Sequence, residues 1–324
     1  GLMSGFLSNT GTAAVLIPVV IGIAASSDFS RGKLLMPLVF AAALGGNLSI
    51  IGAPGNLIGT NALNELGIET GFFEYIGVGL PMLVFGILYF AVFGYKLLPD
   101  NKDLVSADDD QFAAKDFSGV PVWKQTASLV ILILSILAMI FEKQIGVKLH
   151  VSASVGAIIL ILTGVISEKE ALRSIDLKTV FLFGGSLALA SALETTGAGT
   201  LVADAIIHAL GDTPSPFLLL LVIWIVTCAL TNFMSNTATT ALMVPIAVAL
   251  AQGLGADPRA VVVATVIAGS CAYATPIGMP ANTMVVGIGG YSFRDYVKAG
   301  LPLIGVSFVI CMVLLPILFP FFPG

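Results

Sequence analysis

Long apolar runs, separated by short polar groups, make up most of the chain. Because a bilayer crossing takes about 20 apolar residues, we expect one membrane helix in each uninterrupted run. These runs lie at about 10–25, 72–98, 122–141, 150–166, 178–194 and 297–319. Two further stretches, 34–66 and 258–290, are apolar but contain Gly and Pro near their middle. The pattern predicts an all-α polytopic membrane protein with two broken helices.

The two interruptions read GGNLSIIGAPGN (45–56) and ATPIGMPAN (274–282). Glycine and proline disfavour a continuous helix. Non-helical backbone at membrane depth is tolerated only where it is buried in protein or lines a cavity. We therefore expect both breaks to lie inside the protein, next to a functional site.

One polar tripeptide occurs twice. Ser8-Asn9-Thr10 and Ser235-Asn236-Thr237 each open an apolar run. Three more features pair in the same order: Pro18 with Pro245, IGAPGN (51–56) with IGMPAN (277–282), and FFEYIGVGLP (72–81) with FRDYVKAGLP (293–302). The spacing between partners is 227, 227, 226 and 221 residues, so the chain is predicted to contain an internal duplication.

The positive residues indicate how the copies are oriented. If 26–33 lies on one side and the segment around Ser235 enters and returns, that side collects 11 of the 14 Lys and Arg residues. A full crossing at 214–252 lowers this number to ten, so a re-entrant hairpin is favoured there. Positive residues mark the cytoplasmic side. We predict two re-entrant hairpins in inverted-topology repeats, a cytoplasmic 99–121 segment and an extracytoplasmic C-terminus.

The predicted organisation has three parts: a first repeat at 1–98, an acidic cytoplasmic linker at 99–121, and a second, inverted repeat at 122–324. The linker contains six of the 19 acidic residues. The second copy has a long apolar stretch before Ser235, whereas only seven residues precede Ser8. We therefore expect the first repeat to be N-terminally truncated, lacking about 100 residues of a longer protein.

Composition excludes most other classes. The chain is 57% hydrophobic and only 10% charged, with a mean hydropathy of +1.03, whereas soluble domains have about a quarter charged residues. The three cysteines have no metal or disulfide spacing. No set of nucleophile, base and orienting residue can be assembled, so an enzyme is not expected, and neither are an organic cofactor or a nucleic-acid partner.

The polar tips and breaks contain no charge. Residues 1–27, 34–64, 215–256 and 260–293 have no Lys, Arg, His, Asp or Glu. Each tripeptide can cap a helix, and a helix N-terminus attracts anions, but only with partial charge. A divalent anion there needs a bound cation nearby, and a proton relay would need titratable residues. Inverted repeats with broken helices and midplane sites are typical of secondary transporters, and sodium coupling is favoured.

The paired SNT motifs, each followed by a break with Gly-x-Pro-x-Asn, resemble the divalent anion:sodium symporters, the sodium/dicarboxylate and sodium/sulfate carriers. DLKTVFLFGGSLALASALETTG (176–197) and SFRDYVKAGLPL (292–303) also resemble that family. The resemblance implies one Na⁺ at each hairpin tip, substrate between the tips, an elevator-like movement against a scaffold, and a homodimer in the inner or plasma membrane.

Carried over by motif, the resemblance implies a first Na⁺ site at Ser4, Ser8, Asn9 and Gly52, and a second at Thr231, the Met234 carbonyl, Asn236 and Gly278. Substrate-binding residues would be Asn9, Thr10, Ala53, Asn236, Thr237, Met279 and Pro280. Ala53 and Met279 stand where dicarboxylate carriers often have a hydroxyl residue.

The resemblance implies a C4-type dicarboxylate as the substrate expected first. Because Ala53 and Met279 lack a hydroxyl, sulfate is the alternative. An oxyanion or Na⁺/H⁺ exchanger would carry titratable residues in the breaks. A membrane sensor would carry an added domain.

Overall fold

The computed structural model describes residues 1–27, 29–100, 119–175 and 215–322, with scattered positions between 177 and 211. Within those residues every long regular element is a helix and no strand occurs. The chain forms two compact units, Gly1–Ala113 with Phe181–Gly324, and Ala114–Val180. These units divide the chain differently from the predicted repeats, because parts of both repeats lie in the first unit.

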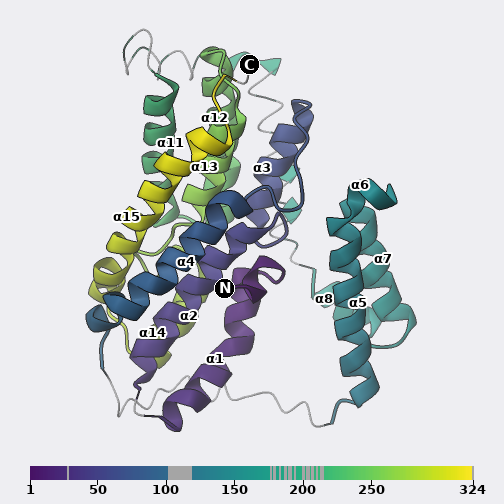
Figure 1. The fold of residues 1–324 in the computed structure, drawn as a ribbon. Helices are drawn as coiled ribbons and strands as arrows, with labels where there is room; N and C mark the ends of the chain where they lie inside the picture. The colour runs from purple at the N-terminus through teal and green to yellow at the C-terminus, as the bar shows by residue number, and fades with distance from the viewer. Residues whose placement is uncertain are drawn as a thin grey trace. The chain divides into compact units, whose positions relative to one another are not determined.

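The smaller unit is a helical pair with a short extension (Figure 1). It contains α5 (Val122–Ile140), α6 (Glu142–Ile145), α7 (Leu149–Leu162) and α8 (Glu168–Arg173). α5 and α7 pack closely, since a methyl group added at Gly156 would clash with Ser135 Oγ. The predicted spans 122–141 and 150–166 thus correspond to α5 and α7. The span expected at 178–194 falls mostly outside the described residues.

The larger unit holds the other helices whose ends the structure describes. Its first part consists of η1 (Met3–Gly5), α1 (Asn9–Ala25), α2 (Arg31–Gly45), η2 (Gly46–Leu48), α3 (Pro54–Glu65), α4 (Ile76–Val92) and η3 (Gly94–Leu97). Its second part consists of α11 (Pro216–Thr231), α12 (Asn236–Gly253), α13 (Arg259–Gly269), α14 (Pro280–Gly289) and α15 (Phe293–Leu318). The helical breaks lie between α2 and α3 and between α13 and α14, where Gly and Pro occur in the sequence.

Helices from the two parts of the larger unit pack against each other. α1 packs on α14, and α12 packs on α3 (Figure 1). Tyr291, which follows α14, reaches α2: its hydroxyl donates to the Gly32 carbonyl at 2.7 Å and accepts from the Met36 N–H at 2.7 Å. The two broken segments are therefore held together in one core.

Two ends of the larger unit can be defined from its contacts. At the first end, Lys33 pairs with Asp100 at 2.6 Å, and Ser30 donates to the Pro99 carbonyl at 3.5 Å. At the second end, Arg259 Nε lies 2.6 Å from Glu74 Oε1, and the Asp257 N–H donates to the Phe321 carbonyl. Lys33 and Arg259 are expected on opposite sides of the membrane, and they lie at different ends of the larger unit.

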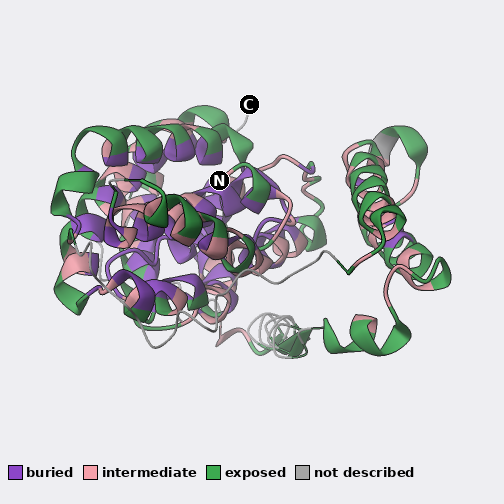
Figure 2. Cartoon of the chain, turned by 90° about the horizontal axis from the view of Figure 1, so that it is seen from below, coloured by how far each residue is buried: buried purple, intermediate pink, exposed green. Residues whose placement is uncertain are grey.

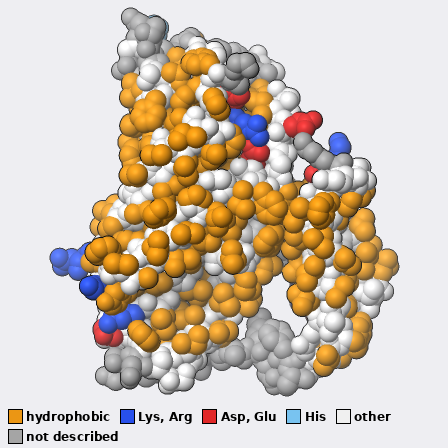
Figure 3. All heavy atoms as spheres, viewed as in Figure 1, with side chains coloured by type: hydrophobic (Ala, Val, Ile, Leu, Met, Phe, Trp, Pro, Cys, Tyr) orange, Lys and Arg blue, Asp and Glu red, His pale blue; other side chains and the backbone are white. Residues whose placement is uncertain are grey.

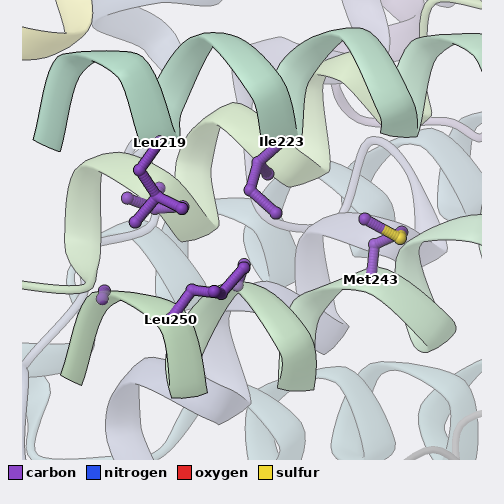
Figure 4. Close-up of a cluster of buried hydrophobic side chains, with 7 residues drawn as sticks. Leu219, Ile223, Met243 and Leu250 are labelled. Atoms are coloured by element: carbon purple, nitrogen blue, oxygen red, sulfur yellow. The ribbon is translucent and has the colours of Figure 1, made fainter. Parts of the chain in front are cut away.

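α11 and α12 run in opposite directions. α11 begins at the second end, and α12 finishes there. Leu219, near the start of α11, packs with Leu250 near the end of α12 and with Val261 at the start of α13 (Figure 4). Ile223 and Met243 continue the same cluster away from that end. The turn between α11 and α12 therefore lies away from that end, and two of its residues, Phe233 and Met234, are exposed.

Burial is concentrated where the broken segments meet. Every residue of α13 from Ala260 to Gly269 is buried, and Figure 2 shows purple at the centre of the larger unit and green on its outer helices. The outer faces of α4 and α15 are apolar, with Phe85 53%, Val313 53% and Ile317 68% exposed, and Figure 3 shows this hydrophobic cover. Such a surface fits a lipid environment better than water.

By length and composition, α5 and α15 could each cross a membrane; five shorter apolar helices occur in the described residues, among them α1 and α11.

Candidate functional site

Each repeated tripeptide forms the start of a helix. Ser8 Oγ accepts from the Gly11 N–H at 3.1 Å, and Ser235 Oγ accepts from the Ala238 N–H at 3.3 Å. Serine is favoured at this capping position because its oxygen satisfies an unpaired backbone donor. Asn9 and Asn236 are thereby fixed as the first residues of α1 and α12, and both side chains are half-buried.

Three oxygens surround one amide atom of Asn236. That atom lies 2.9 Å from Thr231 Oγ1, 3.2 Å from the Gly269 carbonyl and 3.2 Å from the Gly278 carbonyl. The Thr231 hydroxyl donates to the Gly269 carbonyl at 2.5 Å, so it has a lone pair left for Asn236. The position joins α11, α12, the end of α13 and the second break.

Two arrangements satisfy this position chemically. With the amide nitrogen facing the oxygens, Asn236 donates hydrogen bonds to all three. With the amide oxygen facing them, four oxygen atoms converge, and a cation bound among them would offset their mutual repulsion. Sites for hard cations are built from oxygen ligands of this kind, and unwound carbonyls coordinate Na⁺ in broken-helix transporters. Thr231, Gly269, Gly278 and Asn236 can therefore hold a small cation.

The first tip has a matching arrangement. Ser4 Oγ donates to Asn9 Oδ1 at 2.8 Å, and Thr231 Oγ1 contacts the Asn236 amide at 2.9 Å with the same sequence separation. A methyl group added at Gly46 would clash with Asn9 Oδ1, so a side chain there would displace the Asn9 amide. Gly52, the break residue predicted for this site, instead lies against the Gly46 carbonyl, which leaves no room for a side chain at Gly52. Gly46 thus lies between Asn9 and Gly52.

One buried asparagine holds each break in shape. Asn56 Nδ2 donates to the carbonyls of Gly46 at 2.8 Å and Ser49 at 2.6 Å. Asn282 Nδ2 donates to the carbonyls of Ala272 at 2.8 Å and Thr275 at 2.9 Å. We call each of these pairs of hydrogen bonds an amide bridge. Both amide bridges are buried. In each, one acceptor carbonyl lies ten residues before the asparagine and the other lies seven residues before it.

A tyrosine at or near the start of the following helix supports each amide bridge. Tyr75 donates its hydroxyl to the Asn56 carbonyl, and Tyr296 donates to the Asn282 carbonyl, each at 2.8 Å. The hydroxyls of Ser49 and Thr275 join the breaks to the segments that precede α1 and α12, by donating to the carbonyls of Gly5 and Asn232. The same polar contacts thus recur at the 221–227 residue spacing seen in the sequence.

The start of α3 connects the two tips. A methyl group at Gly55 would lie 2.9 Å from Thr240 Oγ1 of α12, and Thr240 in turn donates to the Asn236 carbonyl at 2.9 Å. Gly55 is three residues after Gly52, which belongs to the Asn9 group. The two tips therefore lie in one continuous core.

The expected substrate residues differ in accessibility. Thr10 and Thr237 are half-buried beside Asn9 and Asn236, and Pro280 is exposed at the start of α14. Ala53 and Met279 are only 8% and 3% exposed. Both N-cap the helices α3 and α14 without a side-chain hydrogen bond, as expected for residues that lack a hydroxyl. Met234 lies in the turn after α11 with its side chain 38% exposed.

The site is electrically neutral apart from backbone dipoles. The described ion pairs Lys33–Asp100 and Arg259–Glu74 lie at the two ends of the larger unit. α1, α12, α3 and α14 all begin at the tips or breaks, and helix N-termini carry a partial positive charge. The arrangement therefore offers backbone dipoles to an anion and oxygen groups to cations.

The helix starts at Asn9 and Asn236 and the two breaks lie where the sequence predicted them, but the sequence did not assign roles to several residues. Gly46 and Gly269 contact the tip asparagines, and Asn56 and Asn282 form the amide bridges. Asn56 and Asn282 end the paired IGAPGN and IGMPAN motifs, so the repetition itself was a usable signal for them. Gly269 lies before the second paired motif, and no pattern in the sequence marks it.

The known proteins that this chain resembles are named as transporters. The family model described as citrate transporter matches residues 1–268. An uncharacterized transporter of Haemophilus influenzae is 30% identical over 314 residues, covering 92% of this chain and 66% of the relative. An uncharacterized transporter of Methanocaldococcus jannaschii is 30% identical over 289 residues, with 87% and 64% covered.

A sodium-dependent dicarboxylate transporter of Staphylococcus aureus (strain USA300) is 27% identical over 341 residues, with 93% of this chain and 64% of the relative covered. The chain thus spans about two thirds of the length of these relatives. The resemblance to the divalent anion:sodium symporters is confirmed by the family match and by these relatives. Because the family model covers residues 1–268 of 324, the chain belongs to the citrate transporter family, a family of integral membrane transporters and not of enzymes.

Proposed function

We propose that the protein is a sodium-coupled symporter of divalent anions, with C4-type dicarboxylates as its first substrate class. The observation that supports this most directly is the group of oxygens around the Asn236 amide: Thr231 Oγ1 at 2.9 Å and the Gly269 and Gly278 carbonyls at 3.2 Å. A cation there would be bound without any carboxylate, so the cation keeps its net positive charge. That charge is then available to attract an anionic substrate.

Sodium is the coupling ion in this proposal and travels with the substrate. The second site comprises Thr231, Met234, Asn236 and Gly278, joined by Gly269. The first site comprises Ser4, Ser8, Asn9 and Gly52, joined by Gly46. The repetition of the Ser4–Asn9 and Thr231–Asn236 contacts supports two ions, one at each tip.

The substrate is proposed to lie between the two tips. Its oxygens would meet Asn9, Thr10, Asn236 and Thr237, with Ala53, Met279 and Pro280 forming the adjoining wall. A dicarboxylate is favoured because relatives at 25–28% identity are named sodium-dependent dicarboxylate transporters. Sulfate is the alternative, since Ala53 and Met279 offer no hydroxyl to a longer anion.

The proposed architecture is a pair of inverted repeats with two re-entrant hairpins. The recurrence of the amide bridges, and the return of α12 to the end where α11 begins, support this reading. We further propose a multi-pass protein of the inner or plasma membrane, with 99–121 cytoplasmic and the C-terminus outside. In its homodimer, the larger unit would move in an elevator-like manner.

Uptake by the full-length protein in proteoliposomes tests the function. Radiolabelled succinate should accumulate under an inward Na⁺ gradient and not under an equal K⁺ gradient. Asn236→Ala removes a cation ligand and should lower the apparent Na⁺ affinity by roughly tenfold or more. Thr283→Ala, which alters an exposed hydroxyl one residue after the Asn282 amide bridge, is the matched control. Equal uptake in Na⁺ and K⁺ would refute sodium coupling.

Competition and topology experiments test the finer points. Unlabelled sulfate that displaces succinate at lower concentration than succinate itself would favour the sulfate alternative. A proton gradient that drives uptake without Na⁺ would favour an exchanger. Ser106→Cys should react with a membrane-impermeant thiol reagent only from the cytoplasmic side, and labelling from outside would refute the orientation.

A further inference from the structure

An apolar groove runs between α11 and α15 in the larger unit. Its volume is about 530 Å³, within the ~300–1,000 Å³ typical of ligand sites. α11 contributes Ile225, Cys228 and Ala229, and α15 contributes Val297, Leu301 and Gly305. These walls select an apolar occupant.

The groove is open to the outside of the unit and not enclosed in its core. Ile225 is 47% exposed, Phe293 53% and Leu301 53%, and all three line it. Further hydrophobic side chains of α15 are exposed as well, with Val309 at 57% and Val313 at 53%. In a membrane protein a groove on such a face opens toward lipid, so an acyl chain can enter it directly.

The groove is longer than the hydrocarbon part of one leaflet is thick. Its lining residues on α15 extend from Phe293 to Phe308, a distance of about 22 Å at 1.5 Å per helical residue. The hydrocarbon of one leaflet is about 15 Å thick, half of a ~30 Å core. The groove can therefore take a complete acyl chain lying along the helix.

Positive side chains occur where the groove begins. Arg294 and Lys298 are exposed in the first turns of α15, each one position after a lining residue. Asp295, the acidic residue between them, accepts from the Ser292 N–H at 2.8 Å and from its hydroxyl at 2.6 Å. Its carboxylate is therefore engaged in capping α15. Basic residues at a membrane surface attract anionic lipids.

We propose that this groove binds one acyl chain of an anionic phospholipid whose phosphate lies at Arg294 and Lys298. The groove is also lined by Asn232 and Phe233 at the α11–α12 turn and by Thr275 in the second break. The lipid would thus contact the elements that position Asn236 and Gly278. Binding of the lipid does not depend on the proposed transport function.

Lipid retention by the purified full-length protein tests the proposal. The protein is equilibrated in nanodiscs with equal amounts of phosphatidylglycerol and phosphatidylcholine, released, and its bound lipids are identified by native mass spectrometry. Wild type should retain phosphatidylglycerol in preference to phosphatidylcholine. Each of Arg294→Gln and Lys298→Gln should lower this preference about fivefold, as expected from ~1 kcal/mol per basic residue.

Filling the groove provides the second arm. A methyl group at Gly305 meets nothing within 4 Å, so Gly305→Leu should fold and occupy the groove. Gly22 in α1 also has open space around it, and Gly22→Leu is the matched control. Gly305→Leu should lose the retained lipid, whereas Gly22→Leu should keep it at the wild-type level.

Several results would overturn the proposal. The proposal is wrong if Gly305→Leu retains as much phosphatidylglycerol as wild type does. It is also wrong if wild type retains phosphatidylglycerol and phosphatidylcholine equally. A lower melting temperature of Gly305→Leu with unchanged lipid would indicate that a protein helix occupies the groove. If Gly305→Leu does not fold, the Arg294→Gln/Lys298→Gln double variant decides, and an unchanged lipid preference in that variant refutes the proposal.

Discussion

Replacement of Asn282 by alanine tests whether the amide bridges hold the breaks in shape. Asn282 Nδ2 donates to the carbonyls of Ala272 at 2.8 Å and Thr275 at 2.9 Å, and Asn282 has no exposed surface. Asn282→Ala removes both donors at once. Two buried carbonyl oxygens then lack these hydrogen bonds in a segment whose backbone is not helical.

The expected loss of stability follows from these two contacts. A buried acceptor left without its donor costs about 1–3 kcal/mol, which gives about 2–6 kcal/mol for two. Side-chain hydrogen bonds in a membrane protein average only about 0.6 kcal/mol, because freed groups find other partners. The breaks offer few other donors, since both carbonyls face the core, so we expect a loss of about 3 kcal/mol.

Steric trapping in bicelles can measure the free energy of unfolding of the full-length variants. Asn56→Ala should lose a similar amount, because Asn56 makes the same two contacts at 2.8 and 2.6 Å. Thr283→Ala is the control. Its exposed hydroxyl donates to the Pro276 carbonyl at 2.9 Å, and its loss should change stability by less than about 0.5 kcal/mol.

A third variant separates hydrogen-bond donation from side-chain shape. Asn282→Asp keeps the shape of asparagine, but an ionised carboxylate cannot donate to the two carbonyls. It should be at least as destabilised as Asn282→Ala. The reasoning is refuted if Asn282→Asp is as stable as wild type, or if both alanine variants lose no more than Thr283→Ala.

Further predictions concern packing and charge. Gly300→Ala should prevent folding because its methyl group would clash with the Tyr273 carbonyl oxygen. Gly305→Ala has open space around its methyl group and should fold normally. Size-exclusion profiles in detergent distinguish the two variants. Arg259→Met leaves the 5%-exposed Glu74 carboxylate without its 2.6 Å partner and should cost about 2–4 kcal/mol, somewhat less than a fully buried pair; equal stability of Arg259→Met and wild type would contradict this. Lys33→Met breaks a more exposed pair and should cost at most about 1 kcal/mol in the same unfolding assay.

The tips and breaks could be located from sequence for a physical reason. Serine and asparagine at a helix start, and glycine with proline within an apolar stretch, restrict the local backbone whatever surrounds them. The helices α1, α12, α3 and α14 accordingly begin at Asn9, Asn236, Pro54 and Pro280. The absence of charge from these segments is also a property of the sequence alone.

Other features depend on how helices are rotated and packed. Gly269 approaches Asn236 only because α13 lies beside α12, and the start of α3 reaches Thr240 only because helices of the two copies pack on each other. The groove between α11 and α15 joins residues up to 84 positions apart. Sequence therefore determined the local backbone, the paired motifs and the neutral character of the site, because these follow from residue types and their order. The tertiary structure decided which oxygens converge and which surfaces stay open, because those depend on contacts between distant segments.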